Sequence, residues 1–148
     1  MPDNKAIVTK LLDALWSKGQ LSVVDELVSK DFVGYWPFRA EPVRGPVEYK
    51  ELVSDMRKIF PDQTMKLLDT VSEGEKVVTR FEVTGTHRAE FLTIPATYKT
   101  LTVEGLAISR IENGKILETR VQMDTLSMLR GLGIVSSQIA MPAHVIAR

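Results

Sequence analysis

Residues 114–133, GKILETRVQMDTLSMLRGLG, bring together polar side chains of types that can do chemistry. Read as a strand, the segment places Glu118, Arg120, Gln122 and Asp124 on one face and apolar residues on the other. A carboxylate held about 3 Å from a proton next to a carbonyl group, in a dry environment, can remove that proton. Whether this polar face lines a pocket or faces water therefore decides whether Asp124 can act as an acid/base.

Asp124 also has a structural interpretation. It directly precedes the helix-like run TLSMLRGLG, so its carboxylate can accept backbone N–H bonds and face the positive end of the helix dipole. On these residues alone, capping is favoured over catalysis, and the two roles do not exclude each other. Arg120 and Gln122, on the same strand face, are candidate substrate-binding residues, with Arg120 suited to an anionic intermediate or a carboxylate.

His87 ends a strand-like segment and begins an unpatterned stretch, residues 88–98, that is long enough for a functional loop. One interpretation makes His87 a proton donor to an enolate oxygen. The other makes it a structural residue that ties the loop to a backbone carbonyl. Apolar and aromatic residues of two loops are expected to rim an apolar pocket nearby, namely Trp36, Phe38, Phe91, Ile94 and Tyr98.

Three helix-like segments and then four strand-like segments must position these residues. Apolar residues recur at helical spacing in residues 7–16, 23–28 and 46–59, with Pro46 suited to a first helical turn. Strand-like alternation follows in residues 64–72, 76–87, 98–111 and 115–124. The short turns between the strands, one of them Asn113-Gly114, predict antiparallel hairpins. This order of segments, helices first and strands after, predicts an α+β fold. In it, helices cover one face of a curved antiparallel sheet and close a cone around a pocket.

Composition limits the domain organisation and the partners. The chain of 148 residues, 44% hydrophobic, suits one domain over 1–148, with a core at about 5–133 and a weakly patterned C-terminal tail at 134–148. A net charge of zero argues against nucleic acid and anionic membranes as partners. The first helix lacks a signal pattern and no apolar run approaches a membrane span, which predicts a cytoplasmic protein.

The residue types also bear on cofactors and on assembly. The chain has two histidines without the spacing of metal ligands, no cysteine and no phosphate-binding glycine loop. These features predict that it uses no metal and no other cofactor. A four-stranded sheet covered by helices on one face leaves its other face partly apolar. We therefore expect a homodimer that buries this face.

The ordered motifs resemble the SnoaL-like polyketide cyclase (ester cyclase) family of the nuclear-transport-factor-two-like superfamily. RGPVEYKELVSDMRKIFPD resembles the family's Gly-Pro-x-x-x-Lys helix and Phe-Pro-Asp. EGEKVVTRFEVTGTHRAEFLTIPATYK resembles its Glu-Gly-Asp, Gly-Thr-His and Ile-Pro-Pro-Thr-Gly-Lys segments. ISRIENGKILETRVQMDTLSMLRGLG resembles its Arg-Ile-x-x-Gly-Lys-Ile-x-Glu-x-Trp-x-x-x-Asp ending. The resemblance covers residues 5–133.

The resemblance implies a nuclear-transport-factor-two-like, cystatin-like α+β barrel and a cofactor-free intramolecular aldol ring closure. The family's acid/base aspartate at the end of the last strand matches Asp124, and the histidine of its Gly-Thr-His motif matches His87. Tyr35 stands where family members often have another histidine, so the resemblance makes it a further candidate substrate-binding residue. Arg120 replaces the usual tryptophan, so the chain departs from the family beside the matched aspartate.

The expected function is a cofactor-independent cyclase or isomerase that acts on a polyketide-like or other small hydrophobic carbonyl compound. The alternative is a non-catalytic ligand-binding or dimerising module, in which Asp124 only caps a helix. A further alternative is an epoxide-hydrolase-like or dehydratase site in the same cavity. Arg80 with Glu82 and Arg120 with Glu118 are expected to form ion pairs across the sheet surface, although an epoxide-hydrolase-like site would use such a pair instead.

Overall fold

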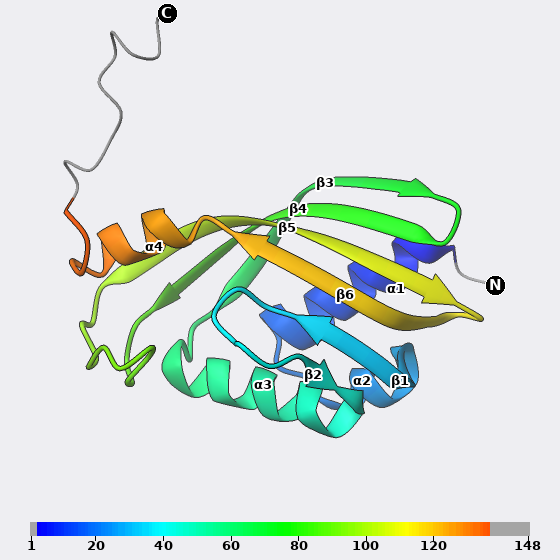
Figure 1. Ribbon diagram of the computed structural model, residues 1–148, viewed down its shortest axis with the longest axis horizontal. Helices are drawn as coiled ribbons and strands as arrows, with labels where there is room; N and C mark the ends of the chain where they lie inside the picture. Colours follow the sequence, from blue (N-terminus) through cyan, green and yellow to red (C-terminus); the bar gives the residue numbers. More distant parts are fainter. Residues whose placement is uncertain (1–2, 137–148) are drawn as a thin grey trace, which may run out of the picture.

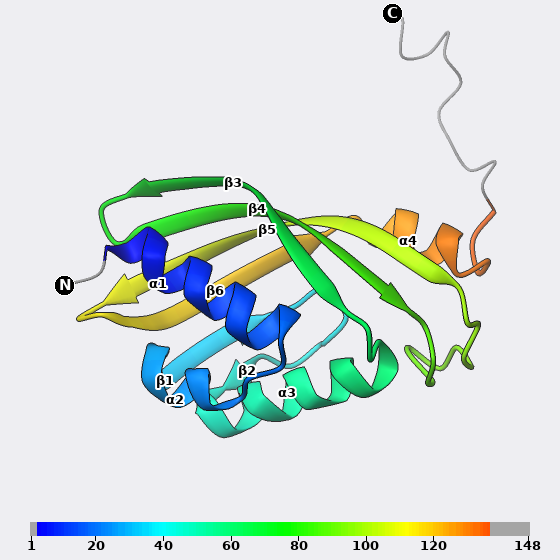
Figure 2. The ribbon, with the colours of Figure 1, turned by 180° about the vertical axis from the view of Figure 1, so that it is seen from behind.

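The computed structural model describes residues 3–136, and Figures 1 and 2 show it from opposite sides. The helical elements are α1 (Asn4–Leu11), the π-helical turn η1 (Leu12–Ser17), α2 (Ser22–Leu27), α3 (Gly45–Ile59) and α4 (Thr125–Gly131). The strands are β1 (Val28–Tyr35), β2 (Val43–Arg44), β3 (Thr64–Glu73), β4 (Lys76–Thr86), β5 (Thr100–Glu112) and β6 (Lys115–Met123).

The N-terminal helices begin where the sequence supplies caps and apolar periodicity. Asp3 caps α1 by accepting a 2.7 Å hydrogen bond from the backbone N–H of Ala6. In α3, Pro46 occupies the first turn, where its missing N–H has no partner to lose. The apolar stripes of both helices face the sheet, and Figure 2 shows α1 crossing in front of the sheet and α3 running along the side of β1.

One six-stranded sheet forms the other layer, in the order β2-β1-β6-β5-β4-β3. The four long strands β3 to β6 pair antiparallel through short turns, as the alternating segments predict. The helices lie on one side of this curved sheet, which does not close on itself (Figure 1). The prediction of an α+β fold with a curved sheet and N-terminal helices is confirmed.

Two strands were missed by the sequence prediction. No strand is predicted before residue 64, yet the chain between α2 and α3 forms β1, which pairs parallel with β6, and the short β2, which pairs with β1. The pairing of β1 with β6 shifts register between Val28 and Val33. This irregularity puts Lys30 and Asp31 at the surface and obscures the alternation that marks a strand.

Side chains alternate between the two faces of the long strands. On β5, the residues from Leu101 to Ile111 in odd positions point toward the helices, and most are buried. The even positions point to the outer, convex face. Most of the predicted C-terminal tail, residues 137–148, lies outside the described residues. Within residues 3–136, no helix is long and apolar enough to cross a membrane.

Candidate functional site

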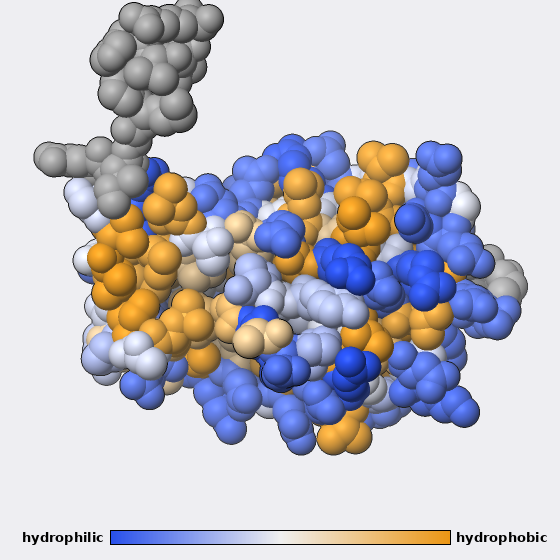
Figure 3. Space-filling model, in the orientation of Figure 1, coloured by the Kyte–Doolittle hydropathy of each residue, from blue (hydrophilic) through white to orange (hydrophobic). Residues whose placement is uncertain are grey.

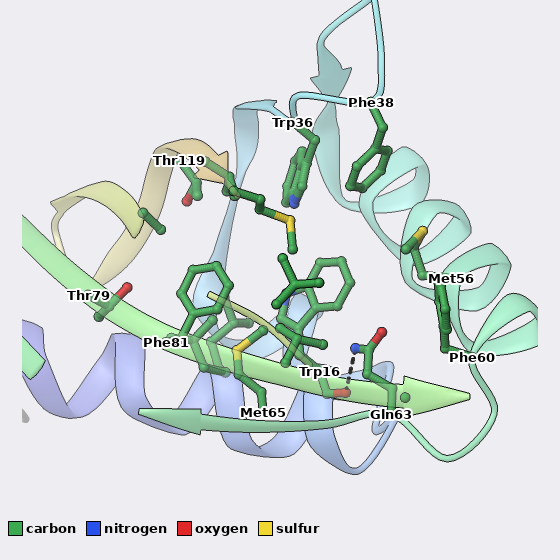
Figure 4. Close-up of a pocket in the computed structure, with 18 of the residues that line it drawn as sticks. Trp16, Trp36, Phe38, Met56, Phe60, Gln63, Met65, Thr79, Phe81 and Thr119 are labelled. Carbon is green, nitrogen blue, oxygen red and sulfur yellow. Dashed lines mark hydrogen bonds between the residues drawn. The ribbon is translucent and has the colours of Figure 1, made fainter. Parts of the chain in front are cut away.

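A pocket of about 80 Å³ lies between the inner face of the sheet and helices α1 and α3 (Figure 4). Its lining is mainly apolar. The strands contribute inward-facing side chains that include Phe81, Val83, Leu101, Val103, Ala107 and Val121, and the helices contribute Val8, Leu11, Leu12 and Met56. No lining residue carries a formal charge. Such a lining suits an uncharged, largely apolar ligand.

One wall of the pocket is an aromatic cluster. Trp16 from η1, Trp36 after β1 and Tyr49 from α3 all line the pocket, with ring centroids 5.4 to 6.2 Å apart. The indole Nε1 of Trp16 donates a 3.1 Å hydrogen bond to the hydroxyl oxygen of Tyr49. Burial raises the pKa of the Tyr49 phenol, which therefore stays protonated and keeps its own O–H as a donor.

The remaining polar groups of the lining are neutral. Gln63 donates a 3.1 Å hydrogen bond from its side-chain Nε2 to the carbonyl of Trp16. Ser109 of β5 and Thr119 of β6 face each other on paired strands, and their hydroxyl oxygens are 3.1 Å apart. Thr79 of β4 presents a buried hydroxyl on the same inner face. The pocket can therefore recognise a polar ligand atom only through neutral hydrogen-bonding groups.

Methionines give this pocket room to adapt. Met56, Met65, Met123 and Met128 line it, which is four of the six methionines in the chain. Its volume of about 80 Å³ is smaller than the roughly 150 Å³ engineered cavity that holds benzene. A ring-sized ligand therefore needs lining side chains to move, and unbranched methionine side chains adjust with little strain.

Asp124 caps helix α4. Its carboxylate accepts hydrogen bonds from the backbone N–H of Ser127 at 3.1 Å and from the Ser127 hydroxyl at 2.6 Å. These bonds, first from the hydroxyl and then from the backbone, hold the pKa of Asp124 below its usual range. The side chain is exposed and is absent from the pocket lining, although the preceding Met123 is part of it. The dry environment and raised pKa expected for a general base are not found here.

His87 is fully buried at the end of β4 and does not line the pocket. Its Nδ1 accepts a 3.2 Å hydrogen bond from the backbone N–H of Thr97, which places the ring proton on Nε2. The backbone of His87 also bonds Tyr98 and Lys99, so this residue fixes both ends of the following loop. The ring bonds a backbone N–H rather than the expected carbonyl, and its position favours the structural interpretation over the proton donor.

Arg120, Gln122 and Tyr35 do not reach the pocket, contrary to the expectation from sequence. Arg120 and Gln122 are exposed on the outer face of β6, and the Arg120 guanidinium lies 4.1 Å from the ring centroid of Tyr35. The cause is strand alternation, because Thr119, Val121 and Met123 occupy the inward positions. The polar strand face that raised the question of chemistry therefore points away from the cavity.

The outer face carries ion pairs, but only one of the two expected pairs, Arg120 with Glu118, forms. Arg120 bonds Glu118 on its own strand at 3.0 Å. Arg80 pairs with Asp69 of β3 at 2.6 Å and with Glu104 of β5, in place of the expected partner Glu82. These charges are outside the pocket, so the geometry does not support an epoxide-hydrolase-like site built from them.

The predicted aromatic rim is found in part. Trp36 and Phe38 line the pocket. Phe91 and Ile94 are buried within the loop between β4 and β5, and Phe91 packs edge-on against Phe38 at 5.6 Å. Phe91 therefore supports the lining from behind, and Ile94 pairs with Phe91 through backbone hydrogen bonds. Tyr98 is 68% exposed and does not line the pocket.

Several lining residues were missed by the sequence prediction, namely Trp16, Tyr49, Gln63, Thr79, Ser109 and Thr119. A signal for the last three was present. Thr79, Ser109 and Thr119 share strand parity with the apolar residues around them, so alternation alone predicts hydroxyl groups facing the core. Within residues 3–136, no group of three or more His, Asp or Glu side chains is placed to hold a metal ion.

The curved sheet, the helices on its concave side and the apolar pocket between them define an α+β small-molecule pocket protein. A family model for SnoaL-like polyketide cyclase matches residues 6–132. The chain belongs to this family. A comparison with curated proteins finds no match.

Solved structures agree with this assignment. A SnoaL-like protein from Jannaschia sp. CCS1 superposes with a TM-score of 0.81 at 21% identity, over 89% of this chain and 92% of its own. IdmH from Streptomyces antibioticus gives a TM-score of 0.76 at 28% identity, over 87% of this chain and 97% of its own. TsrD from Streptomyces laurentii gives a TM-score of 0.79 at 26% identity, over 90% of this chain and 100% of its own.

Proposed function

We propose that this chain binds a small, uncharged carbonyl compound in the central pocket and acts on it as a cofactor-independent cyclase or isomerase. The observation that carries the proposal is the lining itself, which is apolar apart from neutral hydroxyl, indole and amide groups. A carbonyl compound offers apolar surface to such a lining and an acceptor oxygen to its donors. Membership of the SnoaL-like polyketide cyclase family supports an enzyme of cyclase type.

The acid/base role falls to Asp124 in this proposal. Asp124 follows Met123, whose side chain lines the pocket, and it stands where the resemblance places the family's aspartate. Both of its carboxylate oxygens are engaged by Ser127. Proton transfer to or from a ligand therefore requires the Asp124 side chain to leave Ser127 and turn toward the pocket.

A diketone can test the chemistry directly. Heptane-2,6-dione is uncharged, and removing a proton from its terminal methyl group lets that carbon attack the distant carbonyl, whose oxygen takes up a proton as the ring closes. We expect wild-type protein to accelerate this closure. Asp124→Asn should reduce the rate roughly 100-fold or more, since asparagine cannot accept the proton.

The cap provides the internal control for this experiment. Asparagine caps a helix about as well as aspartate, so Asp124→Asn should keep its stability, whereas Asp124→Ala should lose about 1 kcal/mol as well as the activity. Undiminished turnover in a folded Asp124→Asn protein would remove the acid/base assignment. Absence of any acceleration by the wild type would count against a cyclase.

A ligand-binding module without catalysis is the second candidate, and one observation favours it. The carboxylate of Asp124 is exposed, and no charged side chain lines the pocket. Under this alternative the pocket binds the ketone but Asp124→Asn changes neither binding nor any rate. The diketone experiment therefore separates the two candidates.

We also propose that a second copy of the chain covers the outer face of the sheet. Val71 of β3, Leu106 of β5 and Ile108 of β5 are 63%, 50% and 46% exposed on this face. Figure 3 shows apolar side chains gathered over the strands and separated by hydrophilic ones. Burying these large apolar side chains between two copies removes them from water, which favours a homodimer.

A further inference from the structure

Three hydroxyl groups form a polar patch on the otherwise apolar inner face of the sheet. Thr79, Ser109 and Thr119 come from the neighbouring strands β4, β5 and β6, and each lines the pocket. All three residues are buried, with 1%, 4% and 6% of their surface exposed. Figure 4 shows Thr79 and Thr119 on one side of the pocket, opposite Met56 and Phe60.

Hydrogen-bond donors are left over in this hydroxyl patch. Within residues 3–136, the buried Oγ1 of Thr79 has no hydrogen-bond partner. Ser109 and Thr119 share one hydrogen bond of 3.1 Å, and because each hydroxyl has a single proton, one O–H proton remains free whichever residue donates. Burying a hydroxyl without a partner opposes folding. The patch therefore offers unused donors to whatever enters the pocket.

The sheet register brings these donors within reach of one atom. Thr79 pairs with Ala107, and Ser109 pairs with Val77, so Thr79 and Ser109 are diagonal neighbours on the same face. The Cβ atoms of diagonal neighbours in an antiparallel pair lie roughly 7 Å apart. One oxygen between them can accept an O–H bond of about 2.8 Å from Thr79 and, in the arrangement in which Thr119 donates to Ser109, a second one from Ser109.

We propose that the hydroxyl patch of Thr79, Ser109 and Thr119 is a subsite that binds the carbonyl oxygen of a neutral ketone ligand. Neutral hydroxyl donors suit a neutral acceptor oxygen. Because no charged residue lines the pocket, a carboxylate bound there would have no counter-charge, and this disfavours it. This assignment rests on the proposed function, because it names the atom by which the same pocket recognises its ligand. It orients the ligand with the carbonyl group against the sheet.

The test compares two probes of the same shape. Cyclohexanone carries the carbonyl oxygen, and methylenecyclohexane carries a CH₂ group in its place. Thr79→Val removes the hydroxyl at nearly constant shape, and Thr79→Ser retains it. Thr84→Val serves as control, because Thr84 lies on the outer face of the same strand, where it bonds Thr102. Affinities are measured by calorimetry on each folded protein.

We expect Thr79→Val to weaken cyclohexanone binding about 5- to 10-fold, the effect of one neutral hydrogen bond, and to leave methylenecyclohexane binding unchanged. Thr79→Ser and Thr84→Val should bind both probes as the wild type does. Equal affinities of Thr79→Val and wild type for the ketone would overturn the subsite while leaving the pocket intact. Binding of neither probe to the wild type would overturn the pocket proposal, and the subsite with it.

Discussion

The backbone N–H of Thr97 donates a 3.2 Å hydrogen bond to Nδ1 of His87, and the hydroxyl Oγ1 of Thr97 lies 3.0 Å from the same nitrogen. These contacts connect the two ends of the loop between β4 and β5. Inside this loop, Phe91 packs against the pocket-lining Phe38 and Phe60. The His87–Thr97 contact therefore supports one wall of the pocket from outside it.

Thr97→Val removes the hydroxyl from this contact and should lower the free energy of unfolding by about 1 kcal/mol. It should also speed amide hydrogen exchange across residues 88–99, since the loop loses one of its attachments. Thr93→Val is the matched control, because Thr93 is exposed in the same loop and its hydroxyl bonds only the adjacent carbonyl of Leu92. Equal stability and exchange in the two variants would contradict the anchoring role.

Asp62 gives a pH-dependent contribution to stability. Its carboxylate accepts 2.7 Å hydrogen bonds from the backbone N–H and the hydroxyl of Thr86, and these hold the pKa of Asp62 below its usual range. A carboxyl with a lowered folded-state pKa stabilises the fold above its unfolded pKa, and this contribution is lost as pH falls through the folded value. Asp62→Asn should therefore reduce the loss of stability between about pH 5 and pH 2.

Urea unfolding of wild type and Asp62→Asn at a series of pH values checks this prediction. Near neutral pH the two proteins should differ modestly, since asparagine can still accept the backbone N–H of Thr86. In acid their stabilities should converge. Parallel curves over the whole range would show that the Asp62–Thr86 contact does not govern the acid response.

The proposed dimer can be broken at the outer face. Ile108→Lys replaces one of the exposed apolar side chains of this face with a charge, whose burial against a second copy is unfavourable. Sedimentation at micromolar concentration should show a dimer for wild type and a monomer for this variant. Val47→Lys is the control, because Val47 is 69% exposed on α3, away from the sheet face. A monomeric wild type, or a dimeric Ile108→Lys protein, would contradict the interface.

The sequence predicted the fold well where alternation was uninterrupted. Strands β4 and β5 alternate apolar and polar residues along their lengths, and short turns fix their antiparallel pairing. Strand β1 was missed because its register is irregular and its middle carries the exposed Lys30 and Asp31. Its parallel pairing with β6 joins segments far apart in the chain, which local pattern does not reveal.

The site was predicted less well, for a reason that lies in β6. Regular alternation from Thr119 onward places Thr119, Val121 and Met123 inward, so the polar residues Arg120 and Gln122 face out with Glu118, and local pattern does not say which of the two faces looks into the pocket. Trp36 and Phe38 were found because aromatic residues stand out in loops, whereas Trp16 and Tyr49 lie in helical segments and were missed. Threonine and serine hydroxyls were missed because these residues are common in strands, and only strand parity marks them as inward-facing.

Occupancy of the pocket by a neutral ketone is the central claim, and tryptophan fluorescence measures it most directly. Both tryptophans of the chain, Trp16 and Trp36, line the pocket. Cyclohexanone should change their emission saturably in wild type and in Ile108→Leu, which alters only the outer face. Ala107→Leu extends a side chain into the cavity and should weaken this response at least about tenfold. An unchanged titration in folded Ala107→Leu protein, or no saturable response in wild type, would contradict the account.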